Sequence, residues 1–195
     1  MDKTEELVLK VQRGDKDAFE ALFNLYKTKA MRLAYLITNN QTLSDDITQE
    51  AFVQSYLNIK SLRNPQQFKT WFFKILTRLA WKMSTKEKKV IALDAITEPQ
   101  EVDDRINIEN DFIQKEKSEA IMAAIRQLEL KQRTVILLYY YNDFSIAEIA
   151  QILGCFEGTV KSRLHSARKQ LSKSLITLQD ESFEEVKADE IIYEF

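Results

Sequence analysis

The sequence predicts an all-α protein made of two small helical domains joined by an acidic extended linker. Only three Gly and two Pro occur among the 195 residues, which leaves little material for β-hairpin turns or glycine-rich phosphate loops. Apolar residues recur every three or four positions along most of the chain, the spacing of a buried helix face. With 45% hydrophobic and 30% charged residues, the chain has a globular composition and is long enough for two small cores.

Three helices are expected in the first domain. The apolar stripe of Phe19–Ile37 predicts the first. Ser44 suits the N-cap of a second helix that runs to about Ile59, with acids in its first turn beside the positive end of the helix dipole. A third helix follows the turn at Asn64–Pro65 and carries the apolar residues of Phe68–Met83.

Helical periodicity then fails between Val90 and Asp111, where seven acids stand against one base and Pro99 interrupts the chain. This stretch is expected to be an extended linker. The predicted organisation is therefore a first domain at 1–90, an acidic linker at 91–111, a second domain at 112–175 and an acidic tail at 176–195.

The second domain contains a helix-turn-helix pattern. Ser145 and Glu148 have the spacing of a capping box at the start of a short apolar helix. Gly154 supplies the left-handed residue that ends it, and a new apolar stripe begins at Val160. This layout is typical of DNA-binding proteins, in which the second helix enters the major groove. An ordinary helical hairpin with a solvated basic face is the alternative that layout alone leaves open.

Charge is segregated, although the net charge is only −2. Lys60–Lys89 holds nine Lys or Arg residues against one acid, and Gly154–Lys173 holds five against one. Such blocks are expected where a protein meets a phosphate backbone. Aromatic rings are interleaved with the first block, as in proteins that bind single-stranded nucleic acid by stacking. Most of these rings are expected in the core, which leaves Trp81, Phe68 and Phe73 as candidate stacking platforms.

The second predicted helix carries an acidic stripe. Asp46, Gln49, Glu50 and Val53 recur at spacings of three and four on one face, which suits a partner surface. Asp45 and Asp46 are better explained as helix-start carboxylates than as a metal or acid–base pair, because no further oxygen ligand is spaced to join them.

Enzymatic and metal-binding functions are not expected. The single Cys155 and single His165 provide neither a disulfide nor a zinc site, and no nucleophile–base pair is visible. We therefore expect no catalytic residues, metal, cofactor or small-molecule substrate. Without a leader-like start, and with a longest uncharged run of 12 residues at Leu33–Ser44, the chain is expected in the cytoplasm.

Three motifs, in order, resemble the sigma-70 family of RNA polymerase initiation factors, and the short chain resembles its extracytoplasmic-function (ECF) subfamily. Asp45–Val53 resembles the motif that binds core polymerase, and Phe68–Ile75 resembles the promoter-melting segment. Ser145–Ala150 and Gly158–Leu164 resemble the second conserved sigma domain. Together these motifs are highly specific, whereas the helix-turn-helix alone is less so.

The resemblance implies sigma domain 2, which binds core polymerase and melts the minus-ten element, followed by sigma domain 4, which reads the minus-thirty-five element as duplex. The loop Arg63–Gln67 would hold a flipped base, and the acidic linker would occupy the polymerase's RNA channel. For core polymerase the implied residues are Asp45, Asp46, Gln49, Glu50, Val53 and Tyr56. For the minus-ten element they are Arg63, Asn64, Gln66, Gln67, Lys69, Lys74, Arg78, Trp81, Lys82 and Lys86. For the minus-thirty-five element they are Glu157, Thr159, Lys161, Ser162, Arg163, His165, Arg168 and Lys169.

The partners implied are core RNA polymerase, promoter DNA and an anti-sigma factor, which in this family is often membrane-anchored. Two alternatives remain at this point: a stand-alone helix-turn-helix regulator, and an interaction protein that titrates polymerase or an anti-sigma factor. Arg78 and Lys82 depart from the family's usual Asn and Asp, Glu129 from its Pro, and Phe156 from the Ser that caps the recognition helix. The acidic tail is expected to be disordered, to cover the basic helix, or to meet a regulator.

Overall fold

The fold is described by a computed structural model over residues 2–93 and 121–178, and every regular element in those two ranges is a helix. This agrees with the all-α prediction. The predicted linker and tail lie almost wholly outside these ranges. At their edges, α4 continues to Leu93 and α8 to Leu178, three residues beyond the predicted ends of the two domains at 90 and 175.

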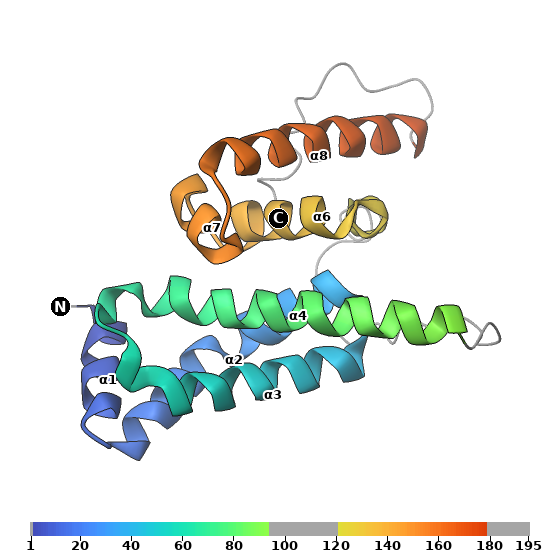
Figure 1. Ribbon diagram of the computed structural model, residues 1–195. Coiled ribbons are helices and arrows are strands. Elements are labelled where there is room, and N and C mark those ends of the chain that lie inside the picture. Colours follow the sequence, from blue (N-terminus) through green and yellow to red (C-terminus); the bar gives the residue numbers. More distant parts are fainter. Residues whose placement is uncertain (1, 94–120, 179–195) are drawn as a thin grey trace, which may run out of the picture.

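The first group of helices packs around α2 and α4 (Figure 1). Its core is aromatic, and Phe52, Phe68, Phe72 and Phe73 are buried within it. In chain order its elements are α1 (Lys3–Gln12), α2 (Lys16–Thr38), α3 (Gln41–Asn58), the short helices η1 (Ile59–Ser61) and η2 (Pro65–Gln67), and α4 (Phe68–Leu93).

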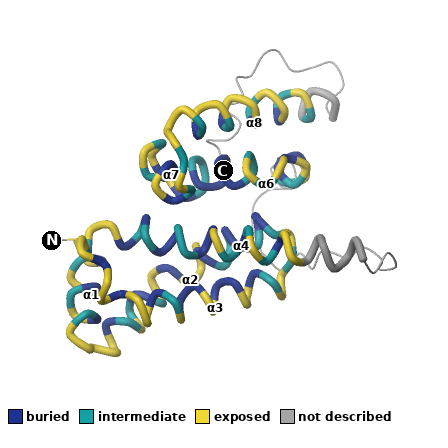
Figure 2. Tube along the Cα trace, in the orientation of Figure 1, coloured by how far each residue is buried: buried dark blue, intermediate teal, exposed yellow. Residues whose placement is uncertain are grey.

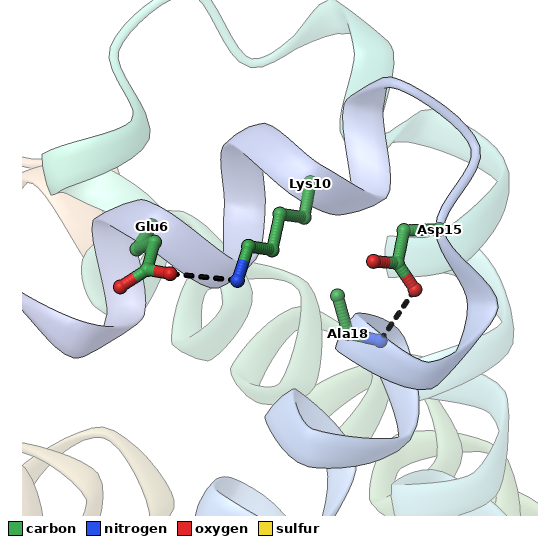
Figure 3. A network of polar contacts seen from close by, with 4 residues as sticks. All are labelled: Glu6, Lys10, Asp15 and Ala18. Atoms are coloured by element: carbon green, nitrogen blue, oxygen red, sulfur yellow. Dashed lines mark hydrogen bonds and ion pairs between the residues drawn. The ribbon is translucent and has the colours of Figure 1, made fainter.

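The corner between α1 and α2 is built from local interactions (Figure 3). Gly14 adopts a φ of 97°, which L side chains rarely tolerate. Asp15 caps α2 by accepting a hydrogen bond from the Ala18 amide at 3.0 Å, and Glu6 pairs with Lys10 at 2.6 Å along α1. The corner sets α1 against η1 and η2, below the start of α4.

Helix α3 starts earlier than the sequence predicts. Asn40, rather than Ser44, is its N-cap and accepts from the Leu43 amide at 3.0 Å. Ser44 is fully buried in the first turn, where its hydroxyl donates to the Gln41 carbonyl at 2.7 Å. The expectation that Asp45 and Asp46 lie in the first turn beside the helix dipole was therefore wrong.

The second group contains the predicted helix-turn-helix. Ser145 caps α7 in a complete capping box with Glu148, and Gly154 ends that helix with a left-handed φ of 64°. Both features confirm the sequence prediction. The elements are a helix over 121–127, α6 (Leu130–Ile136), the π-helical turn η3 (Leu137–Tyr141), α7 (Ile146–Leu153) and α8 (Glu157–Leu178).

The two groups pack directly on each other, with α4 lying along α7 (Figure 1). The ring of Phe73 on α4 meets the buried ring of Phe144 edge-to-face, with centroids 5.2 Å apart. The side of α4 that faces the second group is largely buried or half-buried, whereas the outer face of α8 is largely exposed (Figure 2).

Candidate nucleic-acid interface

The predicted acidic stripe of α3 faces solvent. Asp46, Gln49, Glu50 and Val53 are all exposed. Glu50 accepts a hydrogen bond from Gln54 at 2.8 Å, one turn along the same face. Glu50 is therefore held by its own helix, and all four side chains are accessible to a partner.

An open groove of about 740 Å³ runs between α2 and α3 beside this stripe. Four of the six residues predicted to bind a partner line it: Asp45, Gln49, Val53 and Tyr56. Its other lining residues are Lys16, Phe19, Phe23, Lys27, Met31, Thr48, Phe52 and Leu57. The groove is thus an apolar trough with charged edges.

Sequence reasoning missed two contributions to this surface. Leu57 is 72% exposed, and its position four residues after Val53 on the same helix was an available signal. Phe19 was assigned to the core stripe, but it lines the groove. Its ring packs against that of Tyr56, with the ring centroids 4.8 Å apart. An exposed apolar trough of this kind is typical of a protein-binding surface.

The loop between α3 and α4 presents polar side chains to solvent. Arg63, Asn64, Gln66 and Gln67 are all exposed. Asn64 caps η2 by accepting from the Gln66 amide at 3.1 Å, and Pro65 fixes the first turn. Because η2 is held by these local bonds, the loop offers an ordered set of donors and acceptors.

Gln12 braces this loop from α1, a role that the sequence did not reveal. Its amide donates to the Ile59 carbonyl at 2.9 Å and to the Leu62 carbonyl at 2.8 Å. Both carbonyls lie at the end of α3 and η1, where helix ends leave acceptors short of partners. The Ile59 carbonyl also accepts from the Leu62 amide at 3.1 Å. Gln12 therefore positions residues 63–67 relative to α1.

Replacing Gln12 with Leu is expected to destabilise the first domain by about 1–2 kcal/mol, because the Leu62 carbonyl would lose this donor and the Ile59 carbonyl would keep only its bond from the Leu62 amide. Chemical denaturation measures the change. The exposed Gln127→Leu variant is the control and should change the unfolding free energy by less than about 0.5 kcal/mol. Equal effects of the two substitutions would refute the bracing role.

Two residues predicted to contact DNA are instead engaged with the second domain. Lys69 donates to the Asn142 carbonyl at 3.1 Å and lies 4.3 Å from the Phe144 ring centroid. Its burial lowers the pKa of the Lys69 amine below the ordinary value. Trp81 donates from its indole nitrogen to the Thr134 hydroxyl at 2.9 Å. In this arrangement neither side chain is free to meet DNA.

The expectation that Phe68 or Phe73 provides a stacking platform was wrong. Both rings are fully buried. Phe68 packs against Tyr26 at 5.4 Å between centroids, and Phe73 packs against Phe144. Helix α4 packs against the first domain on one side and against α7 on another. The apolar periodicity of α4 alone does not predict the contact with α7.

The remaining α4 cations form a partly free basic surface. Arg78, Lys82 and Lys86 are exposed, while Lys74 is half-buried. They follow Lys69 along the helix at intervals of four or five residues, which keeps them near one side. This side has the charge needed to follow a nucleic-acid backbone.

The face of α8 that is predicted to contact DNA is largely accessible. Glu157, Lys161, Ser162, His165 and Lys169 are exposed. The apolar residues between them pack inward against α6 and α7. The helix therefore presents the face that the sequence predicts.

Thr159, Arg163 and Arg168 of the same predicted set are half-buried. The guanidinium of Arg168 donates to the Tyr140 hydroxyl at 2.8 Å and lies over the rings of Tyr139 and Tyr140. Arg163 approaches the Cys155 sulfur at 4.0 Å. Arg168 is thus tied to η3 in this structure, which a periodic pattern on α8 alone does not indicate.

Arg133 joins the two domains and was also missed. Its guanidinium donates to the Ile37 carbonyl of α2 at 3.0 Å, to the Leu128 carbonyl at 3.2 Å, and to the Arg126 carbonyl. Burial, aided by the neighbouring Arg126 charge, lowers the pKa of Arg133 below its ordinary value. Its carbonyl partners are backbone atoms, so the sequence offers no signal for them.

Over residues 2–93 and 121–178, no three His, Cys, Asp or Glu side chains gather as metal ligands would. No helix in the same ranges is long and apolar enough to cross a membrane.

Comparison with known proteins identifies the family to which this chain belongs. The family model for sigma-70 region 2 matches residues 22–90, which contain the α3 stripe and most of α4, and that for sigma-70 region 4 matches residues 118–171 with the helix-turn-helix. The ECF RNA polymerase sigma factor SigW of Bacillus subtilis is 36% identical over 176 residues, covering 86% of this chain and 94% of that protein. The chain belongs to the sigma-70 family. It is an ECF-type sigma factor, which acts in promoter-specific initiation with RNA polymerase.

A further relative agrees with this assignment, and two solved structures share the fold. The B. subtilis sigma factor SigV is 32% identical to this sigma factor, covering 80% of this chain and 89% of that protein. CnrH, solved with the cytosolic domain of CnrY, shares the fold with a TM-score of 0.69 at 20% identity, covering 91% of this chain and all of that chain. RpoE of Bartonella quintana, solved with the anti-sigma factor NepR, has a TM-score of 0.67 at 23% identity, covering 85% of this chain and all of that chain.

Proposed function

We propose that three surfaces of this sigma factor have separate roles in transcription initiation. The stripe and groove of α3 bind core RNA polymerase. The loop at 63–67 and the basic side of α4 hold the opened minus-ten element. Helix α8 reads the minus-thirty-five element as duplex. In this proposal residues 1–90 act as domain 2 and residues 112–175 as domain 4.

One observation carries the polymerase-binding part of this proposal: four of the six residues predicted to bind core line the α2–α3 groove. Asp45, Gln49, Val53 and Tyr56 border one open trough, and Asp46 and Glu50 are exposed on the same helix. An apolar centre with a charged rim is the usual anatomy of a protein–protein interface. The groove offers that centre, and the acids offer specificity through charge.

The loop supports the minus-ten assignment. Its exposed amides and the Arg63 guanidinium supply donors and acceptors for an unstacked base, and Gln12 and the Asn64 cap hold the loop in shape. A preformed site reduces the ordering cost of capturing a flipped nucleotide.

The compact arrangement supports a separation of the domains before α4 engages DNA. Lys69 and Trp81 are bound to Asn142 and Thr134 of the second domain. We infer that binding to core moves the second domain away and frees these side chains. Polymerase then contributes to promoter specificity by favouring the open arrangement.

The recognition helix allows a direct test by salt dependence. Lys161→Ala is expected to weaken binding of the holoenzyme to duplex upstream DNA and to reduce the slope of log affinity against log salt by about 1, because the variant makes one phosphate contact fewer. Filter binding across a salt series measures the slope. Lys131→Ala, which removes an exposed cation from α6, is the control. Identical slopes for both variants would contradict a phosphate contact at Lys161.

We also propose that the protein works in the cytoplasm, has no catalytic activity of its own and is restrained by an anti-sigma factor, which is membrane-anchored in many relatives. The support is the family membership and the fold shared with RpoE, which was solved with an anti-sigma factor. The exposed α2–α3 groove is a surface that such a regulator can block.

Run-off transcription across a pool of genomic promoters tests the proposed function. With added core polymerase, this sigma factor should produce discrete transcripts from a subset of promoters. A protein that only titrates polymerase or an anti-sigma factor would give no transcripts. A stand-alone regulator would differ in DNA binding, because it would bind its sites tightly without core.

A further inference from the structure

Phe156 is the most exposed large apolar side chain among the residues with described side chains. It is 87% exposed, compared with 72% for Leu57 and 45% for Val53. It lies outside the α2–α3 groove, immediately before the first residue of α8. The compact packing of the two domains leaves its ring in water, so no part of the described chain accounts for it.

Backbone hydrogen bonds hold the main chain on both sides of Phe156. The Phe156 carbonyl accepts hydrogen bonds from the amides of Thr159 at 2.9 Å and Val160 at 3.2 Å. On its other side, Gly154 closes α7 and the Cys155 amide donates to the Ala150 carbonyl at 3.0 Å. The main chain at Phe156 is therefore part of the hydrogen-bonded turn of the helix-turn-helix.

Helix α8, like α1 and α6, begins without the capping side chain that four other described helices have. Asp15, Asn40, Asn64 and Ser145 each begin a helix and accept a backbone hydrogen bond with their side chains. A Phe side chain has no acceptor, so the helix with the reading face begins without this stabilisation.

We propose that Phe156 is a specificity-determining residue that packs against the C5-methyl group of a thymine in the minus-thirty-five element. This inference rests on the proposed function, in which the N-terminal part of α8 enters the major groove. The thymine methyl is the one apolar group that base pairs present in that groove, and Phe is a side chain that contacts it. The exposed Glu157, next in sequence, places this contact beside the polar readers of α8.

Replacing thymine by uracil tests the contact, because uracil pairs identically but lacks the methyl group. Each thymine of the upstream element is changed on either strand, and the affinity of the holoenzyme for the duplex is measured. At one or two positions the wild-type holoenzyme should lose about fourfold in affinity, the contribution of one buried methyl group. Phe156→Ser should abolish this loss, and Phe156→Leu should retain part of it.

A stability measurement separates this role from a structural one. Phe156→Ser introduces an N-cap acceptor, so the variant should unfold at the same temperature as the wild type or at a higher one. Stability and thymine selectivity should therefore change in different directions. A destabilised Ser variant would indicate that the ring serves packing and would contradict the proposal.

Two further outcomes overturn the inference. One is a wild-type holoenzyme that is indifferent to every thymine-to-uracil change. The other is a Phe156→Ser variant with the wild-type uracil profile, as expected if the ring contacts a regulatory protein instead. Both are distinct from failure of the proposed function, in which scrambling the whole upstream element leaves wild-type binding unchanged.

Discussion

Reversing two charges on α3, with Asp46→Lys and Glu50→Lys together, is expected to weaken binding to core polymerase by at least about 100-fold. Both carboxylates are exposed beside the groove. If α3 binds core as proposed, the change places two cations where the partner surface would complement acids. Like charges facing each other across an interface cost several kcal/mol. Fluorescence anisotropy of labelled sigma factor titrated with core measures the effect, and run-off transcription should fall in parallel.

The fold should survive this change. Within the described part of the chain, Glu50 accepts a surface hydrogen bond from Gln54 of the same helix, and removing a bond of this kind should change the unfolding free energy by less than about 0.5 kcal/mol. The control variant, Glu6→Lys with Asp17→Lys, makes the same change in net charge at exposed positions that do not line the groove. If the control loses as much affinity as the α3 variant, general charge rather than this surface governs binding.

Phe72→Ala is expected to destabilise the protein by about 3–5 kcal/mol, a large part of the stability of a typical domain. The Phe72 ring is fully buried, and its centroid lies 4.7 Å from that of Phe52 and 6.0 Å from that of Tyr26. Truncation therefore opens a cavity where α2, α3 and α4 meet. Denaturant unfolding, followed by circular dichroism, measures the destabilisation.

Phe156→Ala makes the same chemical change at an exposed ring and is the matched control for Phe72→Ala. It should alter the unfolding free energy by less than about 0.5 kcal/mol. Phe72→Leu, which retains most of the apolar volume, should cost about 1.5 kcal/mol. A destabilisation by Phe72→Ala no larger than that by Phe156→Ala would contradict the packing of the first domain.

Local rules predicted the helix-turn-helix well because its signals are short-range. The Ser145–Glu148 capping box and the left-handed Gly154 depend on residues within one or two turns. The same reasoning failed at Ser44, because a serine at such a position can either cap a helix or lie buried inside one. Ser44 lies on the buried face of α3, and its hydroxyl is satisfied by the Gln41 carbonyl of its own helix. A small polar residue at a buried helical position therefore resembles a cap in sequence.

The candidate site shows the same division between local and long-range information. The exposed stripe of α3 and the basic face of α8 follow from helical periodicity on single elements. The groove needs α2 beside α3, and the engagement of Lys69 and Trp81 needs the second domain on α4. Gln12 and Arg133 act mainly on backbone carbonyls, which carry no residue type for a sequence pattern to detect.

The most direct test of the polymerase-binding surface is co-elution of purified sigma factor and core polymerase from a sizing column at micromolar concentration. The wild type should elute with core, and the Asp46→Lys, Glu50→Lys variant should elute separately while remaining folded. If the folded wild type emerged as a separate peak from active core, or if the variant remained bound, α3 would not be the surface that joins this chain to polymerase.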